Sequence, residues 1–322
     1  MTSFLTRSDV EVAHREMHNA AIRTPLLSLP LTGIFLKAES AQRSGSFKFR
    51  GAFNALRYHE PTRVVTGSSG NHGIALALGA AERGVPCTVF MTAGSSTYKQ
   101  DQITHQGGIV VLCDGDNEHR DALARGFAHE SGATFISSHN DRAIIVGQGT
   151  VALEVLSQLP RATDIYVPVG AGGLLAGVCL ATQGGAVRIV GVEPAGADAF
   201  ARSLVGGDRI RLDAADTICD GVRAAEPGEL AFETAAPLVD RIVVVSDDQV
   251  TAALSRLAAV GLRSEITGAL ALAGALADPR RGNHAVAVVT GGNTAILPST
   301  EPASGVTAAN QALPTNREQT WQ

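Results

Sequence analysis

The 322-residue sequence lacks several features that mark whole classes of protein. Its four cysteines lie far apart and form no CxxC pair, so we expect neither a disulfide framework nor a zinc site. No run of about 18 apolar residues occurs, and the charged N-terminus lacks the apolar segment of a signal peptide. Aromatic residues make up only 4% of the chain, and its net charge of −5 is accompanied by no basic block. These absences predict a cytoplasmic protein that binds neither nucleic acid nor membrane.

Lysine is also scarce, because only three of the 26 basic residues are lysine: Lys37, Lys48 and Lys99. A lysine in such a chain is a candidate for chemistry that arginine cannot perform, such as Schiff-base formation. Lys48 follows the small-residue turn Ser44–Ser46 and precedes a helical stretch, which predicts a place in the first turn of a helix between two phenylalanines. The helix dipole and the apolar neighbours favour its neutral, nucleophilic form. The alternative is a surface lysine that merely follows a helix cap.

Apolar residues make up 45% of the chain, which is ample for a large core. Short β-branched runs alternate with longer stretches rich in alanine and leucine, a pattern typical of an α/β protein with mostly parallel sheets. Glycines cluster just after several of the runs, where α/β proteins bind ligands. The expected strands, which fit two sheets better than one, are Arg63–Thr66, Cys87–Met91, Ile109–Cys113, Thr134–Ile136, Ile165–Val169, Ile189–Val192, Ile242–Val245 and Ala285–Thr290.

A polar turn, GSSGNHG, joins the first of these strands to a predicted apolar helix over 74–81. Backbone amides at the start of such a helix, together with the side chains of Ser68, Ser69 and Asn71, form a site for an anion such as a carboxylate. Ordinary capping of the helix by Ser68 or Ser69 explains the same residues equally well.

Two glycine-rich turns follow later strands. Val167–Gly177 reads VPVGAGGLLAG, and its bare amides at a helix N-terminus suit a phosphate. Leu175 stands where a dinucleotide-binding loop has its third glycine, so the spacing is not that of such a loop. The second turn places the Thr290 hydroxyl at the end of a strand. Together with Lys48, these segments supply the parts that hold pyridoxal phosphate and the carboxylate of an amino acid.

Taken in order, the motifs SGSFKFRGA, SSGNHG, GQGTVALEV, PVGAGGLLAG, GVEP and TGGN resemble those of fold-type II pyridoxal-phosphate enzymes, in the serine/threonine dehydratase and serine racemase family. The resemblance implies two open, twisted, mostly parallel α/β domains with the cofactor in the cleft between them. The large domain would comprise residues 1–52 and 146–303, and the small domain residues 53–145. Residues 304–322 would form a polar tail. We also expect a homodimer.

The resemblance implies a role for each motif residue. Lys48 would form the Schiff base with pyridoxal phosphate and act as the base at Cα. Asn71 would bind the phenolic oxygen of the cofactor, and Thr290 would face its pyridine nitrogen, where a neutral hydroxyl favours β-elimination over transamination. The phosphate would be held by Gly170, Ala171, Gly172, Gly173 and Leu174. The amino-acid substrate would be bound by Ser68, Ser69, Asn71 and His72.

The match to the family is incomplete at one site. Racemase-like members bind a divalent cation, Mg²⁺ or Ca²⁺, through a glutamate, a carbonyl and an aspartate. Glu193 and Ala197 match the first two positions, but Ala199 replaces the aspartate. The sequence therefore predicts an incomplete metal site, for which the neighbouring Asp198 could compensate.

Two positions bear on the substrate. Ala224 replaces a serine that racemase-like members place after the segment Asp220–Val222, whereas Ser69 matches the second base of racemases and hydroxyaspartate dehydratases. We expect an ammonia-lyase (dehydratase) that eliminates water from a small β-hydroxy amino acid, such as serine, threonine or 3-hydroxyaspartate, to give a keto acid and ammonia. The alternatives are an amino-acid racemase that uses Lys48 and Ser69 on opposite faces, and a non-catalytic cofactor-binding or regulatory protein.

Overall fold

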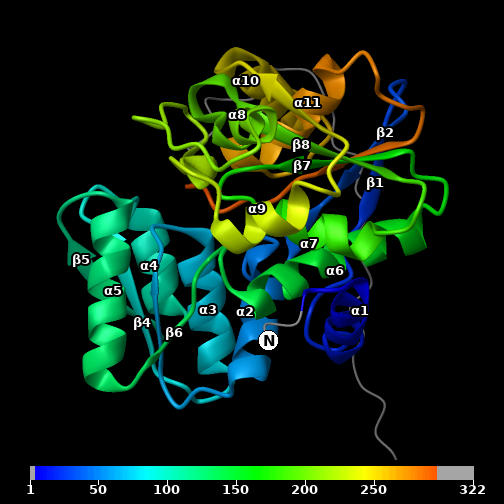
Figure 1. Cartoon of the computed structure of the whole chain (residues 1–322). Helices are drawn as coiled ribbons and strands as arrows, with labels where there is room; N and C mark the ends of the chain where they lie inside the picture. The colour runs from blue at the N-terminus through cyan, green and yellow to red at the C-terminus, as the bar shows by residue number, and fades with distance from the viewer. Residues whose placement is uncertain (1–3, 296–322) are drawn as a thin grey trace, which may run out of the picture.

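The chain folds into two α/β units, each built on one open sheet, as Figure 1 shows for the computed structural model, which describes residues 4–295. The larger sheet has six strands in the order β1-β2-β10-β7-β8-β9, and the smaller has four in the order β5-β4-β3-β6. Neighbouring strands are parallel except in the hairpin of β1 and β2. The strands are β1 (Leu26–Leu29), β2 (Ile34–Lys37), β3 (Val64–Gly67), β4 (Cys87–Thr92), β5 (Ile109–Cys113), β6 (Thr134–Phe135), β7 (Asp164–Pro168), β8 (Arg188–Pro194), β9 (Arg241–Val245) and β10 (Ala285–Val288).

Helices cover both faces of the larger sheet. Along β7, Ile165 and Val167 join a core cluster with residues of α1, α6 and α7, while Tyr166 joins a second cluster with residues of α10 and α11. Because both faces are buried, the central strands β7 and β10 are continuous buried runs rather than alternating ones, whereas the edge strands β1 and β9 keep exposed residues. The helices of this unit are α1 (Arg7–Glu16), α6 (Arg142–Gln158), α7 (Gly173–Thr182), α8 (Ala199–Gly206), α9 (Glu229–Ala235), α10 (Asp247–Ala259) and α11 (Leu270–Ala277).

The smaller sheet is also covered on both faces. Val89 and Met91 of β4 pack in one cluster with residues of α2, α3 and α4, whereas Phe90 packs in another with Ala124 of α5. These helices are α2 (Lys48–His59), α3 (Asn71–Ala81), α4 (Thr97–His105) and α5 (Asn117–Ser131). In both sheets the carboxyl ends of the central strands lead into loops that precede helices. These loops lie where the two units meet (Figure 1).

The predicted fold class is confirmed, and a strand lies in each predicted segment. The hairpin of β1 and β2 was not predicted, because its strands have only four residues each and just one residue of β1, Leu29, is buried. The last predicted strand was too long at its end, since β10 stops at Val288 and leaves Thr290 in the following turn.

Strands β3 to β6 form the smaller sheet, and the strands before and after them form the larger one. This arrangement agrees with an inserted small domain, although the exact boundaries stay a prediction. The predicted polar tail, 304–322, lies outside the described residues. Within residues 4–295, the structure contains no helix with the length and apolar character needed to cross a bilayer.

Candidate active site

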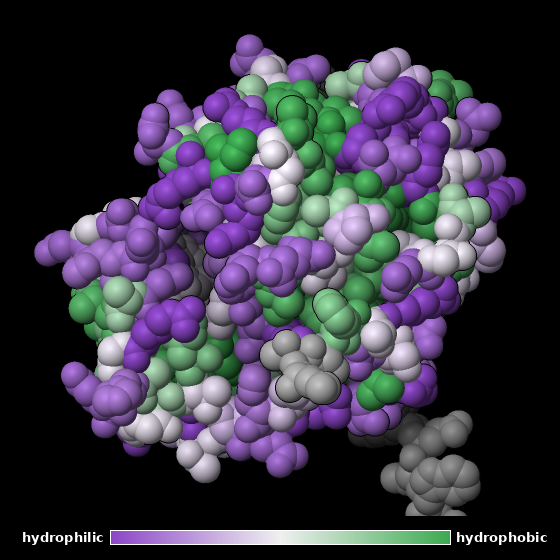
Figure 2. Space-filling model, in the orientation of Figure 1, coloured by the Kyte–Doolittle hydropathy of each residue, from purple (hydrophilic) through white to green (hydrophobic). Residues whose placement is uncertain are grey.

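A cavity of about 860 Å³ lies where the two units meet. The face seen in Figure 2 is hollowed between the two lobes, and hydrophilic side chains gather around the recess. Every residue predicted to bind cofactor or substrate lines this cavity: Lys48, Ser68, Ser69, Asn71, His72, Gly170, Ala171, Gly172, Gly173, Leu174 and Thr290. Segments that are up to about 240 residues apart in sequence are therefore brought to one site.

Backbone hydrogen bonds hold the start of α2 against the end of β10. The Phe47 amide donates to the Thr290 carbonyl oxygen at 3.0 Å, and Ser46 forms an isolated bridge with Gly291. No side chain caps α2, so this contact with the neighbouring turn fixes its first residue, Lys48. Lys48 and Thr290 are thus positioned by the same pair of segments.

The amine of Lys48 has no carboxylate partner among residues 4–295. Its Nζ donates to the Ser138 carbonyl oxygen at 2.8 Å and lies 5.0 Å from the centre of the Phe47 ring. Burial lowers the pKa of Lys48 to about 8. The neutral form that a nucleophile or base requires is therefore far more abundant near neutral pH than in an ordinary lysine.

The two serines before α3 have different surroundings. Ser68 Oγ accepts hydrogen bonds from the amides of Gly70 and Gly73 at 3.3 and 3.2 Å, so Ser68 provides the capping that the sequence assigned to either serine. Ser69 Oγ instead lies 3.3 Å from Nη1 of Arg120, which donates to it, and 3.2 Å from the Thr92 hydroxyl. The Arg120 charge favours a deprotonated Ser69 oxygen.

Two histidines near Lys48 are neutral. Burial, reinforced by the Lys48 charge, lowers the pKa of His72 to about 3 and that of His139 to about 4. His72 Nε2 bonds the Ile136 carbonyl oxygen at 3.4 Å, which makes Nε2 the donor, and Nδ1 is buried without a partner among the described residues. His72 therefore lines the cavity as a neutral ring and offers a substrate no positive charge.

Asn71 belongs to a network that the sequence analysis missed. Its Nδ2 donates to Glu265 Oε1 at 2.5 Å, and its Oδ1 accepts from Asn293 at 2.8 Å. Lys99 Nζ lies 2.6 Å from Asp220 Oδ2 and 3.5 Å from Glu265 Oε2. Burial raises the pKa of Glu265, and Lys99 opposes this shift. Lys99 therefore lines the same cavity as Lys48, but with its charge paired.

The loop from β7 to α7 presents bare amides to the cavity. Gly172, at φ +92°, caps α7 without any side-chain hydrogen bond. A Cβ at Gly172 would lie 2.7 Å from the Phe200 ring, and one at Gly173 would lie 2.9 Å from the backbone of His139. A Cβ at Gly170 would approach the Val222 backbone to 3.0 Å. Glycine is required at Gly172 and Gly173 and favoured at Gly170, and the exposed amides at the helix N-terminus suit a phosphate.

The predicted metal site has a different use in the structure. The Glu193 carboxyl accepts hydrogen bonds from the amides of Phe200 and Ala201 at 2.9 and 2.8 Å and so caps α8. Burial raises the pKa of Glu193 to about 8, and the two amide hydrogen bonds oppose this shift. Ala197 is buried beside it, and Asp198 pairs with Arg202 at 2.9 Å. Residues 4–295 contain no group of three or more His, Cys, Asp or Glu that could hold a metal.

Comparisons with known proteins agree with this arrangement. A family model described as "Pyridoxal-phosphate dependent enzyme" matches residues 18–291. The chain is 36% identical to the serine racemase of Arabidopsis thaliana over 287 residues, which cover 85% of this chain and 86% of the relative. It is 33% identical to the L-threonine ammonia-lyase of Thermotoga maritima over 303 residues, which cover 90% of this chain and 76% of the relative. The solved structure of a T.th. threonine deaminase superposes with a TM-score of 0.87 at 35% identity, over 91% of this chain and 100% of that one.

Proposed function

Because the chain belongs to the pyridoxal-phosphate-dependent enzymes of fold type II, we propose that it is an ammonia-lyase acting on a small β-hydroxy amino acid. The candidate substrates are serine, threonine and 3-hydroxyaspartate, and the products are a keto acid and ammonia. The proposal rests on the amine of Lys48, which has no carboxylate partner in the described chain and shares one cavity with the bare amides of residues 170–173.

The cavity residues fit pyridoxal phosphate. Residues 170–174 would hold the phosphate, and Asn71 would meet the phenolic oxygen. Thr290 would meet the ring nitrogen with a hydroxyl that has no hydrogen-bond partner among residues 4–295. When bound, the cofactor withdraws electrons from Cα of the attached amino acid and makes its proton acidic. Lys48, with a pKa of about 8, is suited to take that proton near neutral pH.

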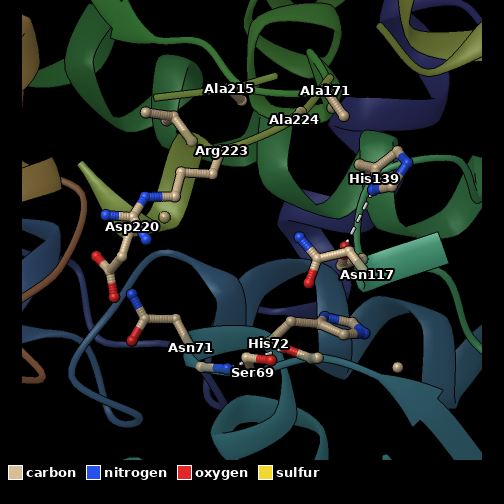
Figure 3. A pocket seen from close by; sticks show the side chains of 18 of the residues that line it. Ser69, Asn71, His72, Asn117, His139, Ala171, Ala215, Asp220, Arg223 and Ala224 are labelled. Atoms are coloured by element: carbon tan, nitrogen blue, oxygen red, sulfur yellow. Dashed lines mark hydrogen bonds between the residues drawn. The ribbon is translucent and has the colours of Figure 1, made fainter. Parts of the chain in front are cut away.

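The N-terminus of α3 would hold the substrate carboxylate. Ser68 stabilises the turn by accepting from the amides of Gly70 and Gly73, so the remaining amides and the Ser69 hydroxyl face the cavity. Figure 3 shows Ser69, Asn71 and His72 side by side on one wall of the pocket. Binding the carboxylate there would orient Cα, and with it the β-hydroxyl that leaves as water.

A racemase is the second candidate, and the contact between Arg120 and Ser69 favours it. Racemisation needs a second group that exchanges a proton at the opposite face of Cα, and the hydrogen bond from Arg120 lowers the cost of deprotonating the Ser69 hydroxyl. The relatives include proteins named for each activity. Replacing Ser69 with alanine should abolish racemisation and spare elimination if both activities occur.

One assay separates the candidates. Purified holoenzyme is incubated with L- and D-serine, L-threonine and the 3-hydroxyaspartates, while keto acid is measured and the remaining amino acid is resolved by chiral chromatography. The lyase predicts keto acid from at least one substrate. Inversion without keto acid would favour the racemase. A shift of the cofactor absorbance with neither product would favour a non-catalytic binding protein.

We further propose a cytoplasmic homodimer with a large domain of residues 1–52 and 146–303 and a small domain of residues 53–145. The free state of Cys87, Cys113, Cys179 and Cys219 supports a reducing compartment. The division of strands between the two sheets supports the domain boundaries. Sedimentation of the purified holoenzyme tests the dimer.

A further inference from the structure

An exposed arginine whose two terminal nitrogens lack a protein partner in the described chain faces the cavity opposite Ser69 and Asn71. Figure 3 shows the Arg223 side chain entering the pocket from the large unit, with its guanidinium on the side of Asp220 and Asn71. Its Nε donates to the Thr217 carbonyl oxygen at 2.8 Å. In the described chain, Nη1 and Nη2 of Arg223 have no hydrogen-bond or ion-pair partner. The terminal fork is therefore free to bind an anion.

The other arginines that line the cavity within residues 4–295 are paired with carboxylates. Arg209 bonds Glu226 at 3.0 Å, and Arg120 bonds Asp121 at 2.7 Å. Arg211 is shared between Glu118 at 2.5 Å and Glu226 at 3.6 Å. The nearby acid Asp220 does not pair with Arg223, since its carboxylate is held by Lys99.

The segment that precedes Arg223 is anchored at two points. Asp247, the first residue of α10, accepts from the Thr217 hydroxyl at 2.6 Å and the Ile218 amide at 3.0 Å. The Gly221 amide donates to the Thr267 hydroxyl at 3.0 Å. Holding the loop reduces the entropy that Arg223 would lose on binding a ligand.

We propose that Arg223 binds a second carboxylate on the substrate, so that the enzyme prefers an acidic amino acid such as 3-hydroxyaspartate. The inference rests on the proposed function and specifies its substrate class. A guanidinium fork matches a carboxylate in geometry and charge, whereas the β-methyl of threonine offers it nothing. The alanines that line the pocket beside Arg223, Ala215 and Ala224, leave room for the extra group (Figure 3).

The test compares two ligands that differ mainly in charge. L-aspartate and L-asparagine are titrated calorimetrically into the holoenzyme, into Arg223→Gln and into Arg209→Gln, a control that removes the same charge from a paired arginine at the same cavity. We expect the wild-type enzyme and Arg209→Gln to bind aspartate about tenfold or more tightly than asparagine, as a charge-assisted bidentate contact allows. Arg223→Gln should lose that preference and keep its affinity for asparagine within about twofold.

Three results would overturn the proposal. The wild-type enzyme could bind aspartate and asparagine with equal affinity, or Arg223→Gln and Arg209→Gln could lose the preference for aspartate to the same extent. Arg223→Gln could also lose affinity for aspartate and for asparagine by the same factor. Elimination is measured separately, with 3-hydroxyaspartate and L-serine. A preference for aspartate without keto acid from any substrate would refute the lyase and leave the recognition by Arg223 standing. Keto acid from L-serine without a preference for aspartate would do the reverse.

Discussion

The two sides of helix α2 each carry a basic side chain, but the surroundings of the two differ. Lys48 and Arg50 are two residues apart, so they point in directions about 200° apart around the helix axis. Arg50 is buried and donates to Glu39 and Glu154, and Lys37 of β2 shares Glu154 at 2.6 Å. We call Lys37, Glu39, Arg50 and Glu154 the buried charge cluster. Lys48, on the other side, has only a carbonyl oxygen as its hydrogen-bond partner in the described chain.

The difference gives Arg50 a structural role and Lys48 a chemical one. In the buried charge cluster, burial opposes the charge of Arg50, but Glu39 and Glu154 outweigh it and raise the pKa of Arg50. At Lys48 nothing outweighs burial, so the pKa falls to about 8. One helix therefore carries a cation that fixes the fold and an amine that is left ready to react.

The largest expected effect is on activity. Lys48→Met should reduce elimination by about 10³-fold or more, because it removes both the attachment point of the cofactor and the base at Cα. Keto-acid assays measure the loss. Lys99 lines the same cavity and is the alternative attachment point for the cofactor. Borohydride reduction and peptide mapping of the wild-type enzyme show which lysine carries it. Cofactor trapped on Lys99 would contradict the assignment.

Removing a member of the buried charge cluster should lower the stability of the protein. Arg50→Met leaves Glu39 and Glu154 without their main partner and should lower the free energy of unfolding by about 3–5 kcal/mol. Urea titration measures the change. Arg7→Met is the matched control, because its pair with Glu11 is exposed and should contribute about 0.5 kcal/mol or less. Similar losses in both variants would mean that burial of the cluster does not matter.

Replacing Lys48 should have the opposite effect to replacing Arg50 and raise the free energy of unfolding of the cofactor-free protein. Its folded pKa of about 8 lies below the unfolded value of 10.5, so the folded state binds fewer protons between these pH values and gains stability as pH rises. Below pH 8 the cost of the buried ammonium is fully present. Cofactor-free Lys48→Met should therefore be more stable than the wild type by about 3 kcal/mol at pH 7.

Measuring the same two proteins across pH sharpens the test. The advantage of Lys48→Met should shrink as pH rises from about 8 to 10.5, and urea titrations at pH 7 and 10 measure it. A pH-independent difference would mean that packing, and not charge, distinguishes the two proteins.

What the sequence could predict follows from how local each feature is. Lys48, Asn71 and Gly170–Gly173 lie at helix starts or in the short turns before them, and the small residues of those turns are visible in the sequence. The partners of these residues have no such signal. Lys99 and Arg120 are ordinary polar residues of α4 and α5, and Glu265 precedes an alanine-rich segment, so only the approach of the two sheets brings them to the cavity.

The role of Lys37 was hidden for a related reason. It ends β2, a four-residue strand of a hairpin that shows no long apolar run, and its acid partner Glu154 lies 117 residues away on α6. Scarcity of lysine drew attention to all three lysines, but only the fold shows that two of them serve in ion pairs.

The smallest expected effect concerns Glu193, a carboxyl that, like the buried charge cluster, serves the fold. Glu193→Gln should change elimination by less than about twofold, and EDTA should change neither protein, because this residue caps α8 and its pKa of about 8 keeps it largely protonated at neutral pH. The raised pKa also determines how stability changes with pH. The wild type loses stability as pH rises from about 4.5 to 8, since the folded state must keep a proton that the unfolded state releases. Glu193→Gln carries no such proton, so its stability relative to the wild type should increase over this range in urea titrations. Strong EDTA inhibition of the wild type, absent in the variant, would show instead that Glu193 holds a cation.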